Sequence, residues 1–202
     1  MGDVESIIRF FYQLEGLKKT YRYKEAKDMP PESTADHTWK LSLMAYAVAE
    51  ELELDINRYH AMELALVHDL PEIVTDDYDA ILVFDGKVSK QKKHDMEKRA
   101  MEAITAILPE KLGKKIYDLW WEYEECKTRE AKYIKALDKL EALSHIIRMG
   151  WKTFDRPDFI PIYAAGSVNN FPELKPMLVI LKRDLKAEYA KGNIPWKPEY
   201  DL

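Results

Sequence analysis

The dipeptide His68-Asp69 combines an imidazole and a carboxylate, which are ligand types that suit hard and borderline divalent ions. It closes an apolar stretch that begins at Ala61 and is typical of a helix, and Pro71 and Glu72 follow almost directly. A polar pair at the end of a buried helix needs partners, because an unpaired buried polar group is costly. The partners of this pair are expected among other polar residues on apolar helix faces.

Two further residues meet that description. His37 lies in a predicted helix over residues 34–52, whose apolar residues, including Trp39, Leu41 and Leu43, are expected to be buried. Asp138 lies among apolar residues in a predicted helix over 129–149. A satisfied core histidine or a structural hydrogen-bond acceptor would explain either residue alone. Together with the His-Asp pair they supply two imidazoles and two carboxylates from three helices. The joint pattern favours a metal site over four unrelated polar positions.

The elements that must position these residues are predicted to be helices. Seven glycines in 202 residues, with many Ala, Glu, Lys and Leu, favour helices over a turn-rich β fold. Apolar periodicity predicts further helices over 3–15, 90–107, from Pro109 onward and over 175–190, with Asp3 as an N-cap and an acidic loop over 74–89. No repeat or linker interrupts the chain. We expect an all-α, single-domain protein over residues 1–202.

Bulk composition excludes several classes of function. The net charge of −5 gives no general basic surface, which argues against a nucleic-acid polymer as partner. No run of residues reaches the roughly 20 apolar positions of a membrane span. Cys126 is the single cysteine, so no intrachain disulfide can form. These features predict a cytoplasmic protein that contacts neither membrane nor nucleic acid.

Four motifs carry a resemblance to a known family. They are Pro-Glu-Ser-Thr-Ala-Asp-His at 31–37, His-Asp-Leu-Pro-Glu at 68–72, Leu-Trp-Trp-Glu-Tyr-Glu at 119–124, and the run from Glu130 to Glu141. With them the chain resembles the HD-domain metal-dependent phosphohydrolases over about residues 14–150. The closer resemblance is to the bacterial 5′-deoxynucleotidases and their eukaryotic HD-domain relatives. It implies an HD-type helical bundle, with 151–202 forming an irregular segment and a C-terminal helix that packs on it.

The resemblance also implies an activity and a site. It implies a cytoplasmic phosphatase that hydrolyses (deoxy)nucleoside 5′-monophosphates to nucleoside and phosphate and forms a homodimer. One divalent ion (Mn, Co, Mg, Fe, Ni or Zn) would be held by His37, His68, Asp69 and Asp138. Glu72 and Asp77 match positions that assist hydrolysis. Such an ion lowers the pKa of its water, and a nearby carboxyl group can move the proton.

The segment after the first predicted helix departs from the family pattern. The family carries Arg-Thr-Gly-Trp there, whose Arg and Trp contact phosphate and sugar, whereas this chain reads Lys19-Thr20-Tyr21-Arg22-Tyr23. Lys19, Arg22 and Tyr23 are the candidate substrate-binding residues. A changed pocket affects the choice of phosphate ester more than it affects metal binding.

Two alternatives stay open at this point. The chain could be an HD phosphohydrolase that acts on another phosphate ester or nucleotide, such as a triphosphate, a cyclic nucleotide or a guanosine polyphosphate. The short chain favours a monophosphate, and His94 is the one extra histidine before Asp138 in the stretch where a second metal would need ligands. The chain could also be a helical binding protein with a structural metal. Metal-dependent phosphate release separates these possibilities.

Overall fold

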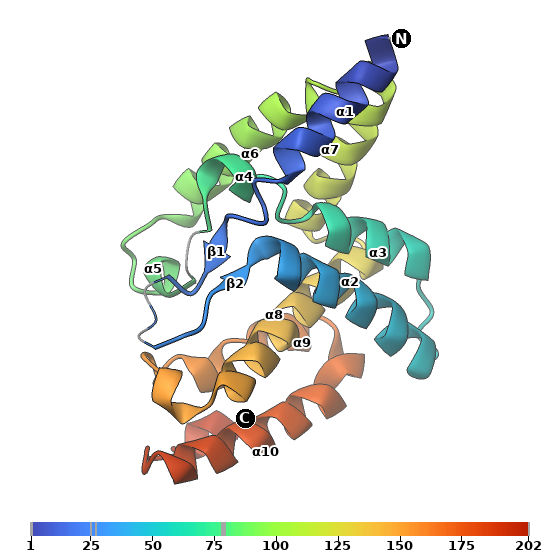
Figure 1. Ribbon diagram of the computed structural model, residues 1–202. Helices are drawn as coiled ribbons and strands as arrows, with labels where there is room; N and C mark the ends of the chain where they lie inside the picture. The colour runs from blue at the N-terminus through green and yellow to red at the C-terminus, as the bar shows by residue number, and fades with distance from the viewer. Residues whose placement is uncertain (1, 25, 27, 78–79, 202) are drawn as a thin grey trace.

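Three helices at the centre of the molecule carry the residues that predicted a metal site. The computed structural model describes residues 2–24, 26, 28–77 and 80–201. In it α2 (Thr34–Glu51), α3 (Arg58–Val67) and α8 (Arg129–Met149) pack against one another, as Figure 1 shows. The predicted helices at 34–52, before residue 70 and at 129–149 are therefore confirmed to within a few residues.

Side-chain caps fix where these helices begin. Ser33 and Asp36 form a reciprocal capping box at the start of α2, with both backbone contacts at 3.1 Å. Asn57 accepts from the His60 backbone N–H at the start of α3. Thr128 caps α8 in the same way, and Gly150, with φ of +86°, ends it. The caps set the register of each helix, and so they decide which residues face inward.

Helix α8 is the axis of the bundle. Its apolar residues are spread around its whole circumference, which is typical of a helix surrounded by others. The buried residues of α8 are Ala131, Tyr133, Ile134, Ala136, Leu137, Asp138, Leu140, Glu141, Ala142 and Leu143. Asp138 and Glu141 are the carboxylates of this set, so this helix brings two carboxyl groups into the protein interior.

The first part of the chain covers one side of this centre. Its other elements are α1 (Gly2–Leu14), β1 (Tyr21–Arg22), β2 (Glu32–Ser33), α4 (Glu72–Thr75), α5 (Ala80–Phe84), α6 (Lys90–Thr105) and α7 (Glu110–Glu125). The two short strands are antiparallel, and Arg22 pairs with Glu32 across them. Helix α7 packs on α3 and α8, and α6 packs on α4 and α7.

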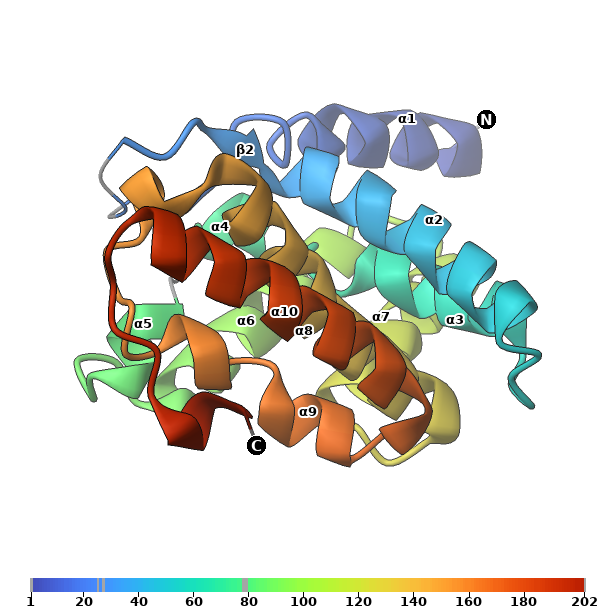
Figure 2. The same cartoon turned by 90° about the horizontal axis from the view of Figure 1, so that it is seen from below.

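The C-terminal part covers α8 from the opposite side. It comprises η1 (Trp151–Thr153), η2 (Ile160–Ile162), α9 (Ala165–Asn169), η3 (Pro172–Leu174), α10 (Lys175–Lys191) and η4 (Pro198–Asp201). Helix α10 packs along α8, as Figure 2 shows, and α9 contacts both. The fully buried Tyr189 donates a hydrogen bond to the Pro157 carbonyl at 2.6 Å. The protein is an all-α, single-domain helical bundle, as the sequence predicts.

Three local expectations were wrong. The predicted loop over 74–89 contains α5, whose single turn is too short to show a helical period. Asp3 lies inside α1, which begins at Gly2. Trp39 and Leu43 are 69% and 55% exposed, because the buried face of α2 is the one that carries Leu41, Ala45 and Ala49. No helix in the described part of the chain is long and apolar enough to cross a membrane.

Candidate active site

The four predicted metal ligands come together at the crossing of α2, α3 and α8. His37 lies in the first turn of α2, His68 and Asp69 directly follow the last residue of α3, and Asp138 lies midway along α8. The Nε2 atom of His37 lies 3.4 Å from His68 Nε2, 3.7 Å from Asp69 Oδ2 and 3.3 Å from Asp138 Oδ1. Asp69 Oδ2 is 2.9 Å from His68 Nε2. The structure thus brings His37, His68 and Asp69 within 4.8 Å of one another and places Asp138 beside this group, in contact with His37.

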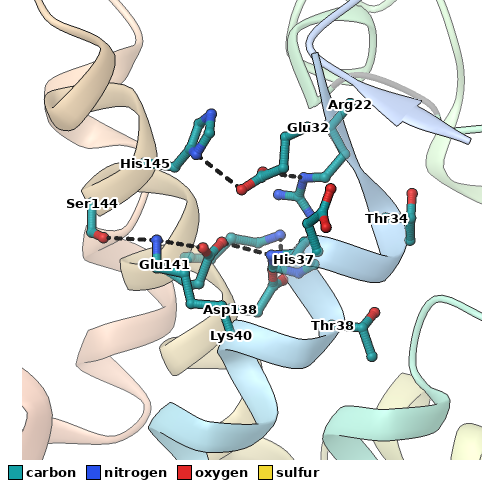
Figure 3. Close-up of polar contacts among 12 residues, drawn as sticks. Arg22, Glu32, Thr34, His37, Thr38, Lys40, Asp138, Glu141, Ser144 and His145 are labelled. Atoms are coloured by element: carbon teal, nitrogen blue, oxygen red, sulfur yellow. Dashed lines mark hydrogen bonds and ion pairs between the residues drawn. The ribbon is translucent and has the colours of Figure 1, made fainter. Parts of the chain in front are cut away.

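Hydrogen bonds to the outer nitrogens orient both imidazoles. His37 Nδ1 lies 2.6 Å from Glu141 Oε2, and His68 Nδ1 lies 2.8 Å from the Ala65 carbonyl (Figure 3 shows the His37 contact). A carbonyl can only accept, so His68 Nδ1 carries a proton and donates it to this hydrogen bond. His37 Nδ1 faces the Glu141 carboxylate, which can only accept, and so it donates in the same way. The Nε2 atoms of both rings then face each other at 3.4 Å, with Asp69 Oδ2 beside both and Asp138 Oδ1 beside His37.

This donor set fits a divalent cation. Acceptor atoms that face one another, as those of His37, His68 and Asp69 do, repel unless a positive charge lies between them. Ligands at about 2.0–2.2 Å from a first-row ion lie about 3.0–3.5 Å apart, depending on the coordination number. The observed separations range from 2.9 to 3.7 Å. Neutral imidazole backed by a carboxylate is also the usual outer arrangement of a metal-binding histidine.

The second oxygen of Asp138 contacts a lysine. Lys139 Nζ lies 2.9 Å from Asp138 Oδ2, and the same ammonium group lies 5.2 Å from the centre of the Tyr163 ring. Burial works against a charged Asp138, but Lys139 and His37 outweigh burial and hold its pKa well below the usual value. The carboxylate is therefore ionised, with Oδ1 directed toward the histidines and Oδ2 toward the lysine.

Glu72 begins α4, directly beyond the His-Asp pair. It is 6% exposed, and its Oε2 atom accepts a hydrogen bond of 2.9 Å from the Thr34 hydroxyl. Burial, followed by the charges of Asp69 and Asp77, raises the pKa of Glu72 well above its usual value. A buried carboxyl group of raised pKa beside a cation site is suited to proton transfer.

A cavity of about 780 Å³ opens beside these residues. One part of its wall is polar and includes His68, Asp69, Glu72 and Asp138. Another part is apolar or aromatic and comes from α5 and the segment around η2; its members include Ile81, Val83, Phe84, Phe159, Ile160 and Tyr163. The volume is in the range of small-molecule sites. Asp77 also lines this cavity, so both predicted catalytic carboxylates face it.

The three candidate substrate-binding residues are placed differently. Arg22 and Tyr23 line the cavity, and Arg22 Nη1 lies 3.8 Å from Asp69 Oδ2. Lys19 is exposed in the turn after α1 and is not among the described residues that line the cavity. The structure therefore brings two of the three to the predicted metal site and leaves the third outside it.

Sequence reasoning did not assign a role to Glu141, Thr34 or Lys139. Glu141 is fully buried between His37 and Lys40, with Oε1 at 2.8 Å from Lys40 Nζ. Its position three residues after Asp138 on an apolar helix was the available signal, since an inward carboxylate needs a partner. The contact of Thr34 with Glu72 spans 38 residues and left no local pattern in the sequence.

Comparisons with known proteins agree with this geometry. A model of the HD domain family matches residues 14–157. The 5′-deoxynucleotidase HDDC2 of Danio rerio is 38% identical over 144 residues, which make up 71% of this chain and 68% of the relative. The 5′-deoxynucleotidase hdd1 of Schizosaccharomyces pombe is 31% identical, with 86% of this chain and 87% of the relative covered.

The fold has solved counterparts as well. A crystal structure from Magnetospirillum magnetotacticum, described as a predicted metal-dependent phosphohydrolase, superimposes with a TM-score of 0.77 over 97% of this chain and 100% of its own, at 20% identity. An HD-domain phosphohydrolase from Listeria innocua gives a TM-score of 0.70 at 22% identity, with 91% and 90% covered. At these identities the likeness concerns the fold. The family match and the curated relatives go further, and together they show that this chain belongs to the HD-domain family of hydrolases.

Proposed function

We propose that this protein is a metal-dependent phosphomonoesterase that hydrolyses deoxynucleoside 5′-monophosphates to nucleoside and phosphate. The observation that carries the proposal is the convergence of ligand atoms of His37, His68 and Asp69 within 2.9–3.7 Å of one another, beside a cavity of about 780 Å³. Asp138 Oδ1 adjoins this group, 3.3 Å from His37 Nε2. The curated relatives named as 5′-deoxynucleotidases support the choice of substrate.

The proposed ligands of the single divalent ion are His37, His68, Asp69 and Asp138. When bound, such an ion polarises a phosphoryl oxygen and lowers the pKa of a coordinated water. Two nitrogen and two oxygen donors suit several first-row ions and Mg²⁺ to different degrees, so the donor set alone does not select one of Mn, Co, Mg, Fe, Ni or Zn.

Glu72 is the proposed proton-transfer group. Its carboxyl group is held by Thr34 at 2.9 Å and faces the cavity. As a carboxylate it accepts a proton from the attacking water, and in its protonated form it donates one to the leaving 5′-oxygen. Asp77 lines the same cavity, and its charge raises the pKa of Glu72, so we assign it a supporting role in the same proton transfer.

Arg22 and Tyr23 are the proposed substrate contacts at the phosphate side. A guanidinium group presents a planar set of donors that matches phosphate oxygens, and it stays charged at any physiological pH. Arg22 Nη1 lies at the edge of the proposed metal site, 3.8 Å from Asp69 Oδ2. The aromatic and aliphatic side chains from α5 and η2 offer a surface on which an uncharged sugar and base can pack.

A homodimer is part of the same proposal. Trp39, Leu43 and Tyr46 form an exposed stripe on α2, and Val4 and Phe11 are 65% and 52% exposed on α1. Exposed apolar groups at helical spacing are typical of a covered face, and we assign a second copy of the chain as the cover. Light scattering should give a dimer mass, and Trp39→Glu should give a monomer. A monomeric parent protein would contradict this assignment.

The function is tested with matched pairs of substrates. Purified protein with Mn²⁺ should release phosphate from 2′-deoxyribonucleoside 5′-monophosphates faster than from the corresponding ribonucleotides. Glu72→Gln should retain bound Mn²⁺ but lose about 10²–10⁴-fold in turnover. Equal loss of metal and turnover would contradict the assignment of Glu72 as a proton-transfer group. No release from any monophosphate by metal-loaded protein would contradict the proposed substrate class.

A further inference from the structure

Arg22 belongs to a cluster of four side chains, with Glu32, His145 and Tyr23, in which each side chain contacts the next. Its Nε atom lies 3.5 Å from Glu32 Oε2, and Glu32 Oε1 lies 2.9 Å from His145 Nδ1. The His145 ring stacks on the Tyr23 ring with centroids 5.3 Å apart and an angle of 2° between the planes. Tyr23 in turn contacts Arg22, whose guanidinium carbon lies 5.4 Å from the centre of the Tyr23 aromatic ring. Figure 3 shows the Arg22–Glu32–His145 part of this arrangement.

Helix α8 carries both His145 of this four-residue cluster and Asp138 of the proposed metal site. Asp138, Glu141 and His145 lie at positions i, i+3 and i+7 of α8 and therefore share one face of it. Asp138 points toward the predicted ligands, Glu141 contacts His37, and His145 contacts Glu32. One rigid helix face thus sets the distance between the proposed ligands of the metal ion and the side chains that hold the guanidinium.

Glu32, His37 and Glu141 do not form a second metal site. Glu32, His37 and Glu141 do place ligand-type atoms within 4.8 Å of one another. However, Lys40 Nζ already lies 2.8 Å from Glu141 Oε1, and His145 Nδ1 lies 2.9 Å from Glu32 Oε1. The carboxylates are compensated by these groups and by the guanidinium. The Glu32 carboxylate therefore pairs with Arg22 and His145 and not with a metal ion.

Glu32 also opposes a competing attraction. The Arg22 guanidinium lies between two carboxylates, with Asp69 at 3.8 Å from Nη1 and Glu32 at 3.5 Å from Nε. Without Glu32, the guanidinium would be drawn toward Asp69, a proposed metal ligand, and would lose its fixed position on the cavity wall. A long, flexible side chain binds an anion best when its donors are already in place.

We infer that Glu32 and His145 are positioning residues that hold the Arg22 guanidinium at the cavity wall for recognition of the substrate phosphate. The inference rests on the proposed function, and it adds two residues that do not line the cavity themselves. A group that binds ground state and transition state alike changes KM and leaves kcat nearly constant. Glu32→Gln and His145→Ala should therefore raise KM for a deoxynucleoside monophosphate about tenfold, with kcat within about twofold.

A double-mutant cycle tests whether Glu32 acts through Arg22. Arg22→Ala should raise KM at least as much as Glu32→Gln, and adding Glu32→Gln to Arg22→Ala should change KM by less than about twofold. Bound Mn²⁺ should stay the same in all variants. The exposed Lys18→Ala, which removes a cation from the same connector, is the matched control and should leave KM unchanged. A full effect of Glu32→Gln in the Arg22→Ala background would overturn the inference.

Inorganic phosphate separates this inference from the proposed function. Calorimetry on Mn²⁺-loaded protein should show phosphate binding that weakens about tenfold in Glu32→Gln. If that loss is seen but no monophosphate is hydrolysed by the parent protein, the proposed function fails and the positioning role stands. If hydrolysis is seen and Glu32→Gln changes neither KM nor phosphate affinity, the positioning role fails. Should Glu32→Gln not fold, His145→Phe, which keeps an aromatic ring against Tyr23, provides the same comparison.

Discussion

Replacing Glu141 by Gln should weaken metal binding although the residue is not a proposed ligand. Glu141 is fully buried, and its two oxygens contact His37 Nδ1 at 2.6 Å and Lys40 Nζ at 2.8 Å. Burial opposes its charge, but the hydrogen bond to His37 and the contact with Lys40 outweigh burial and lower the pKa of Glu141 to about 2. The group is therefore a carboxylate at neutral pH, and it increases the basicity of the inward-facing nitrogen of His37.

The size of the effect follows from this arrangement. Glutamine has nearly the same shape and can still accept from His37, but it lacks the negative charge. Loss of such an outer carboxylate costs about 10–100-fold in metal affinity, which is about 1.4–2.7 kcal/mol. Loss of a charge-assisted hydrogen bond should also lower the free energy of unfolding by about 1.5–3 kcal/mol.

The assay is calorimetric titration of Mn²⁺ into chelator-treated protein, with activity measured at each metal concentration. Activity of Glu141→Gln should recover when Mn²⁺ is raised above its new Kd. The matched control is Glu122→Gln, since Glu122 lies 2.9 Å from His60 Nε2 in a comparable pair outside the predicted site. Unchanged Mn²⁺ affinity in Glu141→Gln, or an equal loss in Glu122→Gln, would refute the reasoning.

Three further perturbations probe other parts of the site and core. Asp69→Ala should abolish stoichiometric Mn²⁺ binding measured by elemental analysis, and retained metal would argue against its role as a ligand. Thr34→Val removes the 2.9 Å hydrogen bond to Glu72 and should lower kcat about tenfold with bound metal unchanged; an unaltered kcat would show that Glu72 needs no such support. Leu137→Ala, at a fully buried position of α8, should lower the free energy of unfolding in urea by about 2–5 kcal/mol, whereas a loss under 1 kcal/mol would place this position outside the rigid core.

The sequence predicted the architecture well where periodic patterns were long. Helix α8 (Arg129–Met149) could be located to within a residue at each end. The turn of α5 could not, because five residues are too few to show a helical period. The exposure of Trp39 was also missed, since apolar spacing identifies an apolar face but does not tell whether this chain or a partner covers it.

Part of the candidate site could likewise be predicted from the sequence, and part could not. His68 and Asp69 are adjacent, and Asp138 is an inward carboxylate, so residue types alone suggested that they act together. The placement of Arg22 depended on the short strand pair that sets it opposite Glu32, and two-residue strands leave no readable signal. The contact of Glu32 with His145 joins residues that lie far apart in the sequence, and it depends on tertiary packing.

The most direct test of the account is a titration of Mn²⁺ into chelator-treated protein, with bound metal and phosphate release from a deoxynucleoside 5′-monophosphate followed together. We predict that release is absent without metal and rises in proportion to bound metal up to one ion per chain. Asp138→Asn should lose metal and release in parallel. Phosphate release by fully chelated protein, or stoichiometric metal binding with no release from any monophosphate, would contradict the claim that these four residues form the metal centre of a nucleotidase.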